Sequence, residues 1–100
     1  MPKGYLIARV RIDDMEQYRQ YMARSPGVIA RFGGRFIVRG GENETVEGEA
    51  ETRRLVVVEY PSYQAARDCY YSDAYQEIIP LRADAGEGQF VVVEGFDENG

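Results

Sequence analysis

The chain has 100 residues, of which 44% are hydrophobic and 29% are charged. These proportions are typical of a soluble globular domain and too apolar for a disordered segment. We therefore expect one domain over residues 1–100 with a single hydrophobic core. Seventeen acidic residues against 12 basic ones give a net charge of −5, which disfavours a nucleic-acid partner because phosphate binding depends on Lys and Arg.

The residue types that are rare or missing exclude several kinds of site. The chain has no His and no Trp, and Cys69 is its single cysteine, so a His-based triad and an internal disulfide are excluded. No Gly-rich phosphate loop opens a helix after a strand. We predict a colourless protein with no metal, flavin or other cofactor. The absence of a long apolar run and of a secretory signal, together with the lone cysteine, favours a cytoplasmic protein.

The first third of the chain predicts a strand followed by an interrupted helix. Apolar side chains alternate along residues 4–12, as they do in a strand. Asp13 is a good N-cap for a helix near residues 14–32. Because Pro26 cannot donate a backbone hydrogen bond, we expect this helix to be interrupted there.

The middle of the chain predicts two more strands joined by an acidic segment. Residues 35–40 and 54–60 are rich in large apolar side chains, which favours strands. Five glutamates lie in residues 41–53 between them, and a solvated hairpin loop is the simplest interpretation. Extra strand past a β-bulge at Gly40 and Gly41 is the alternative. The glutamates lack the ligand spacing of a metal site.

The last part predicts a second interrupted helix and a final strand. Ser62 is placed to cap a helical region near residues 62–84. Ser72 can cap a further helical piece, which Pro80 should kink or divide. Residues 89–96 contain an unbroken apolar run and form the last predicted strand.

This order of elements, βαββαβ, is that of the ferredoxin-like α+β fold with a four-stranded antiparallel sheet, usually in the order 4-1-3-2. Both helical regions then cover the same face of the sheet. The strands at 54–60 and 89–96 are apolar on both faces, so the other face needs a cover too. A second copy of the chain, packed sheet against sheet in a two-fold homodimer, is the simplest cover.

Several stretches of the sequence resemble the DUF1330 family, a domain of unknown function within the dimeric α/β-barrel superfamily. They are GYLIA (4–8), GGRFIVRGG (33–41), RLVVVEYPS (54–62), AAR (65–67) with Tyr70, and SDAYQ (72–76) with PLR (80–82). The resemblance implies a ferredoxin-like monomer and a dimer whose two sheets form a barrel. It implies no reaction, since the family has none established. We expect Trp at the position of Cys69 in many relatives, so an aromatic lining there would be thinner in this chain.

Charged residues on apolar strands are the first candidates for a site, because a buried charge is costly unless it is paired. They are Arg9, Arg11, Arg39, Glu59 and Glu94. One interpretation is internal ion pairing, in which Arg9 reaches Glu59 or Glu94 across the ladder. The other is a polar cluster that binds a ligand. Arg39 favours the second interpretation, because two glycines follow it and open the backbone.

Eight tyrosines are many for a chain of this length, and they can either pack the core or line a cavity. Near a predicted helix end, Arg82 either interacts with the helix dipole or contacts an anion. We predict that a ligand site lies in a cleft between sheet and helices and is formed by Arg39, Glu59, Tyr18, Tyr70, Tyr75 and Arg82. In the competing account Arg39 and Glu59 pair with each other or with Arg9, and the tyrosines only pack.

Three classes of function fit these features. The first is a dimeric protein that binds a small organic molecule, anionic molecules included. The second is a cofactor-independent enzyme, monooxygenase-like or isomerase-like, whose general base in the absence of His is Glu59, Glu94 or a tyrosinate. The third is a structural dimer without a ligand. Cys69 is expected to be a buried hydrophobe and not a nucleophile.

Overall fold

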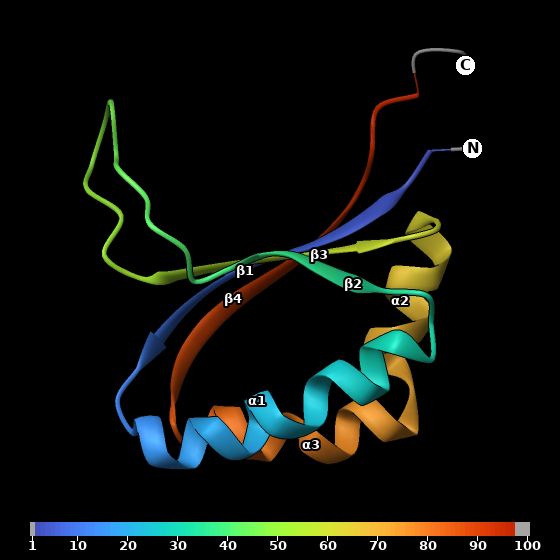
Figure 1. The fold of residues 1–100 in the computed structure, drawn as a ribbon, viewed down its shortest axis with the longest axis horizontal. Helices are drawn as coiled ribbons and strands as arrows, with labels where there is room; N and C mark the ends of the chain where they lie inside the picture. Colours follow the sequence, from blue (N-terminus) through green and yellow to red (C-terminus); the bar gives the residue numbers. More distant parts are fainter. Residues whose placement is uncertain (1, 98–100) are drawn as a thin grey trace.

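The structure, a computed structural model, describes residues 2–97 and confirms the ferredoxin-like α+β fold. Four strands form one antiparallel sheet in the order β2-β3-β1-β4, and the three helices lie on one side of it (Figure 1). Among the described residues, no helix has the length and apolar character needed to cross a bilayer. The bounds of the elements are β1 Gly4–Ile12, α1 Met15–Ala30, β2 Arg35–Arg39, β3 Arg54–Tyr60, α2 Tyr63–Tyr71, α3 Asp73–Ala83 and β4 Gly86–Glu94.

The register of the sheet divides its side chains between two faces. Ala8 of β1 lies beside Val56 of β3 and Phe90 of β4, and these three side chains face the helices. Because successive side chains alternate, Ile7 lies on the opposite face beside Val57 and Val91. We call this second surface the open face; among the described residues, no helix covers it.

The core lies between the sheet and the helices. It includes Val58, Tyr75 and Ile78, which are almost completely buried, and the free thiol of Cys69. Burying such side chains is the main favourable contribution to folding. The expectation that Cys69 is a buried hydrophobe is confirmed, since its exposed fraction is 1%.

Helix α1 differs from the prediction in two ways. Its N-cap is Asp14 and not Asp13, because the Asp14 carboxylate accepts the backbone N–H of Gln17 at 3.1 Å. The predicted interruption at Pro26 is wrong, because α1 continues through it. A proline at this position leaves the carbonyl of Met22 without its usual helical donor. The Arg39 guanidinium donates to that carbonyl at 3.0 Å, so the helix tolerates the proline.

The caps of the other helices are confirmed. Ser62 Oγ accepts the backbone N–H of Ala65 at 3.0 Å, and Ser72 Oγ accepts that of Tyr75 at 3.2 Å. Of the kink or division predicted at Pro80, the division is wrong, because α3 runs through the proline. Strand β4 begins three residues earlier than the predicted 89–96.

The connection between β2 and β3 is an exposed loop over residues 40–53, which projects away from the sheet (Figure 1). No strand is assigned within that loop, so the simpler interpretation is confirmed. The β-bulge lies between Phe36 and Val38 and not at the glycines. It shifts the register so that Phe36 is opposite Val58 and Arg39 is opposite Val56. Both side chains therefore face the helices, although a regular strand would place them on opposite faces.

Candidate functional site

A narrow crevice lies between the helix-covered face of the sheet and α1. It holds about 400 Å³ of empty space with its open mouth included, but the centre of a water molecule reaches only about 20 Å³ of it. That is room for about one water, so a larger ligand requires the lining side chains to move apart. Most of the lining is apolar, and the polar groups are Tyr18, Tyr21, Ser25, Arg39 and Arg54.

Two of these polar groups are buried without a hydrogen-bond partner. Ser25 comes seven residues after Tyr18 on the inward side of α1, and its exposed fraction is 1%. Arg54 begins β3, on the face that also carries Val56 and Val58. Ser25 Oγ and Arg54 Nε are the buried side-chain polar atoms of the described residues that lack a partner. An unpaired buried polar atom costs about 1–3 kcal/mol, so two in one crevice require an explanation.

Arg39 is the second cation of the crevice, and the β-bulge in β2 directs it there. Its guanidinium lies 4.3 Å from the centre of the Phe36 ring and donates one N–H to Met22. Arg54 in turn donates to the Arg39 carbonyl at 3.4 Å. Gly40 has φ +69°, and a side chain there would collide with the Arg54 guanidinium. The glycine is therefore needed for Arg54 to lie beside the backbone that follows Arg39.

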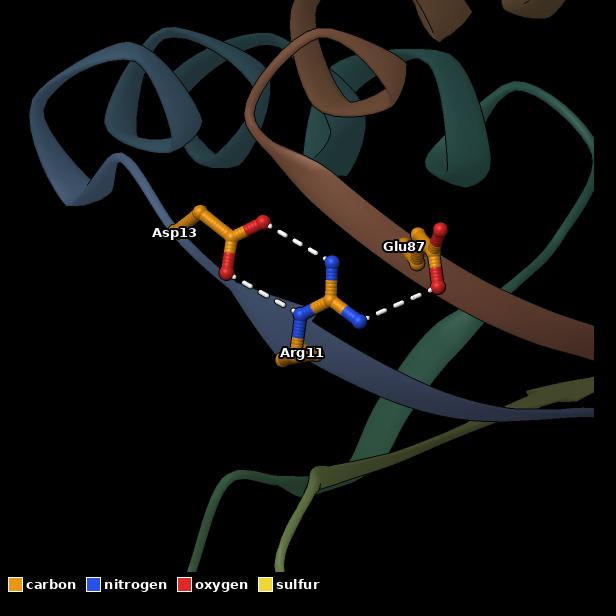
Figure 2. A network of polar contacts seen from close by, with 3 residues as sticks. All are labelled: Arg11, Asp13 and Glu87. Atoms are coloured by element: carbon orange, nitrogen blue, oxygen red, sulfur yellow. Dashed lines mark hydrogen bonds and ion pairs between the residues drawn. The ribbon is translucent and has the colours of Figure 1, made fainter.

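The arginines of the strands differ in whether a carboxylate pairs with them. Arg11 bridges Asp13 and Glu87 with three contacts of 3.0 Å (Figure 2), and its hydrogen bonds to Asp13 hold the pKa of that carboxyl below its usual range. That network is exposed, so it contributes little to stability. Arg39 and Arg54, in contrast, line the crevice, and no Asp or Glu is among the described residues that line it with them. The crevice is therefore positively charged in a chain of net charge −5.

A cluster of tyrosines and one arginine lies behind the crevice. The hydroxyls of Tyr21 and Tyr75 are 2.5 Å apart, and Arg82 Nε–H donates to Tyr75 at 3.4 Å. The Arg82 guanidinium also lies 3.8 Å from the centre of the Phe90 ring, which favours a cation–π contact. Burial raises the pKa of the Tyr18 and Tyr21 phenols. Tyr75 and Arg82 thus support the wall of the crevice without lining it.

Two of the six predicted site residues lie elsewhere. Tyr70 contacts Tyr71 and Tyr75 with ring centres 5.1 Å and 5.5 Å apart, and it lines a separate, open hollow. Glu59 is on the open face, where it pairs with Arg35 at 3.1 Å. The predicted grouping of Glu59 with the cleft residues is therefore wrong, because the register turns its side chain away from the helices.

The predicted internal ion pairs also differ from those found. Arg9 lies opposite Leu55 and Gln89, so its proposed pairing with Glu59 or Glu94 is wrong. The hydroxyl of Tyr5 donates to Glu59 at 3.5 Å. Among the described residues, no three His, Cys, Asp or Glu side chains gather closely enough to hold a metal ion.

Sequence reasoning missed three polar residues of the crevice, Tyr21, Ser25 and Arg54. Ser25 directly precedes Pro26, where an interruption of the helix is predicted, although its spacing from Tyr18 and Tyr21 places it on their helix face. Arg54 alternates in phase with Val56 and Val58, which is a signal for the same face of the sheet. Both signals are present in the sequence.

Comparison with known proteins agrees with this fold. A protein of unknown function from Rhodopseudomonas palustris, RPA0582, is 21% identical with a TM-score of 0.74, covering 96% of this chain and 84% of that one. A dimeric ferredoxin-like protein of unknown function from Jannaschia sp. CCS1 is 16% identical with a TM-score of 0.69, covering 92% and 98%. SnoaB from Streptomyces nogalater, a cofactor-independent oxygenase, is 10% identical with a TM-score of 0.70, covering 99% and 98%.

These solved structures are similar in fold only, and no curated protein matches the sequence. The family described as "Domain of unknown function (DUF1330)" matches residues 3–96, nearly the whole chain. This chain belongs to the DUF1330 family.

Proposed function

We propose that this protein is a homodimer that binds a small organic molecule in the crevice between the sheet and α1. The observation that carries the proposal is a pair of buried donors without a partner, Ser25 Oγ and Arg54 Nε, which belong to two residues that line the same crevice. A buried hydroxyl and a buried guanidinium N–H lower the stability of the folded protein while they lack a hydrogen-bond acceptor. A ligand that accepts from both removes that cost.

Binding is favoured over catalysis by where the possible bases lie. Glu59 is on the opposite face of the sheet, and Glu94 is exposed and does not line the crevice. The Tyr21 phenol has its pKa raised by burial and by Tyr75, so it holds its proton more firmly than a free tyrosine. A tyrosinate base is thus disfavoured in this chain, although its fold resembles that of a cofactor-independent oxygenase.

The open face supports the homodimer. Val38, Val91 and Val93 each expose about two fifths of their surface there, next to Ile7 and Val57. An apolar patch spread over all four strands is unfavourable in water and favours a partner. A second copy related by a two-fold axis offers the same apolar surface. We also propose a cytoplasmic location, where a free thiol such as that of Cys69 persists.

The test is the melting temperature of the protein with a panel of small organic acids, phenols and their neutral analogues. At least one member should raise it, and Ser25→Ala should remove that rise. Because the Ser25 hydroxyl has no partner, Ser25→Ala should leave the melting temperature of the free protein unchanged or higher. An Arg19→Gln variant at an exposed position of α1 is the control and should respond as the wild type does.

Two results would contradict the proposal. The first is a panel in which no compound raises the melting temperature. The second is a Ser25→Ala variant that is clearly less stable and still responds to the ligand, which would give Ser25 a purely structural role.

A further inference from the structure

The crevice also indicates what kind of molecule it takes, an inference that rests on the proposed function. We propose that its ligand is a small carboxylate with a compact apolar body, held at its carboxylate end by Arg54 and Ser25. The first argument is charge. Arg39 and Arg54 both line the crevice, and no Asp or Glu among the described residues lines it with them. Elsewhere Arg11, Arg35 and Arg53 each pair with a carboxylate of this chain.

The second argument is the number and type of open donors. Arg54 uses one Nη for the Arg39 carbonyl and leaves its buried Nε–H without an acceptor. Ser25 leaves a buried O–H without one. A carboxylate has two oxygens, one for each of these donors, and a guanidinium edge matches its planar geometry. A phosphate group brings more charged oxygens than these two buried donors can satisfy.

The third argument is the rest of the lining. Phe36, Phe90 and Met22 surround the crevice together with aliphatic side chains of the strands. An apolar body is stabilised by that surface, whereas a polar body such as a sugar would lose its hydrogen bonds to water. The crevice is also narrow, with little free space for even a water-sized group. Because any ligand larger than a water needs the lining side chains to move apart, these features favour a small body over a large one.

Tyr18 lines the same crevice as Arg39 and Arg54. Burial raises the pKa of its phenol, and the nearby charges of Arg54, Arg82 and Arg39 lower it by less, so the phenol stays neutral. An anion near the Tyr18 hydroxyl therefore lies among cations and next to a neutral donor.

The alternative is that the two arginines only stabilise backbone. Arg39 does donate to the Met22 carbonyl, and Arg54 does donate to the Arg39 carbonyl. Each contact uses one of the five N–H groups of a guanidinium. The alternative also leaves the buried Nε of Arg54 and the hydroxyl of Ser25 unexplained.

The experiment compares acids with amides of the same shape by isothermal titration calorimetry: benzoate with benzamide, and hexanoate with hexanamide. Inorganic phosphate forms a separate arm. We expect at least one acid to bind about 10-fold or more tightly than its amide, because a charge-assisted pair replaces a neutral contact. Arg54→Gln should reduce that ratio to near one, and the Arg19→Gln control should keep it. The ratio in the wild-type protein is informative even if Arg54→Gln does not fold.

The outcomes separate this inference from the proposed function. If both amides bind as tightly as their acids, the crevice is a binding site but the carboxylate inference is overturned. Tighter binding of phosphate than of either acid also overturns it. If neither the acids, the amides nor any other compound of the panel binds, both the inference and the proposed function fail.

Discussion

Arg39 supplies the hydrogen bond that Pro26 removes from α1. Pro26 has no backbone N–H for the Met22 carbonyl, and Arg39 Nη2 donates to that carbonyl at 3.0 Å. The two residues are therefore coupled, although they lie on different elements. This contact fixes one end of the Arg39 side chain and leaves its other donors available at the crevice.

The coupling predicts a specific pattern in stability. Arg39→Ala should lower the free energy of unfolding by about 1 kcal/mol, since the Met22 carbonyl loses its donor at a partly exposed site. In a Pro26→Ala background the new backbone N–H replaces that donor, so the same substitution should cost less. Urea unfolding of the wild type, the two single variants and the double variant measures this difference. Equal costs in both backgrounds would show that the two residues are independent.

The tyrosine pair between α1 and α3 gives a second prediction. Tyr21→Phe and Tyr75→Phe each remove one hydroxyl of a buried hydrogen bond and should each cost about 1–2 kcal/mol. The double variant should cost less than the sum, because both substitutions remove the same bond. Tyr71→Phe is the control, since Tyr71 is 66% exposed and should be close to neutral. Additive losses would contradict the account.

Alkaline pH should unfold the protein. Burial raises the pKa of Tyr18, Tyr21 and Tyr60 above the ordinary value of 10.0. In the unfolded chain these phenols release their protons near pH 10, whereas in the folded protein they hold them. The stability they contribute is therefore complete below about pH 10 and decreases as the pH rises beyond it.

Urea unfolding at about pH 8 and about pH 11 measures this effect, with tyrosinate absorbance followed in parallel. Part of the tyrosine absorbance should change only when the chain unfolds. If all the tyrosines ionised in one step near their ordinary pKa of 10.0, with no loss of stability, that result would contradict the burial of these phenols.

The homodimer is tested by a charge on the open face. Val57→Asp places a carboxylate among apolar side chains and should convert the dimer to a monomer at micromolar concentration. Val46→Asp is the matched control, because Val46 lies in the exposed loop over residues 40–53 and is 84% exposed. Sedimentation should give about twice 11.4 kDa for the wild type and for the control. A wild-type monomer would refute the sheet-face dimer.

Local patterns in the sequence predict most of the fold. The alternation in residues 4–12 and the caps at Ser62 and Ser72 depend on neighbours a few residues away, and the structure confirms them. The continuity of α1 could not be predicted in this way. It depends on a donor 17 residues beyond the Met22 carbonyl, on a different element.

The site was harder to predict than the fold, for a similar reason. A one-residue bulge decides that Arg39 faces the helices, and the register decides that Glu59 does not. The bulge is not marked by a local sequence signal here, whereas the alternation along β3 does place Glu59 on the face opposite to Val56 and Val58. Ser25 and Arg54 were recoverable from periodicity, but their significance depends on the absence of partners, which only the structure shows.

The most direct test of the account is the side-chain Nε–H signal of Arg54, followed by NMR during a titration with benzoate and assigned with the Arg54→Lys variant. If the crevice binds a carboxylate, this signal should move progressively and saturate, while the Nε–H signal of the exposed Arg19 stays in place. Ser25→Ala should weaken the response. An Arg54 Nε–H signal that does not move, or that moves no more than that of Arg19, would contradict the assignment of Arg54 and Ser25 as the ligand's anchors.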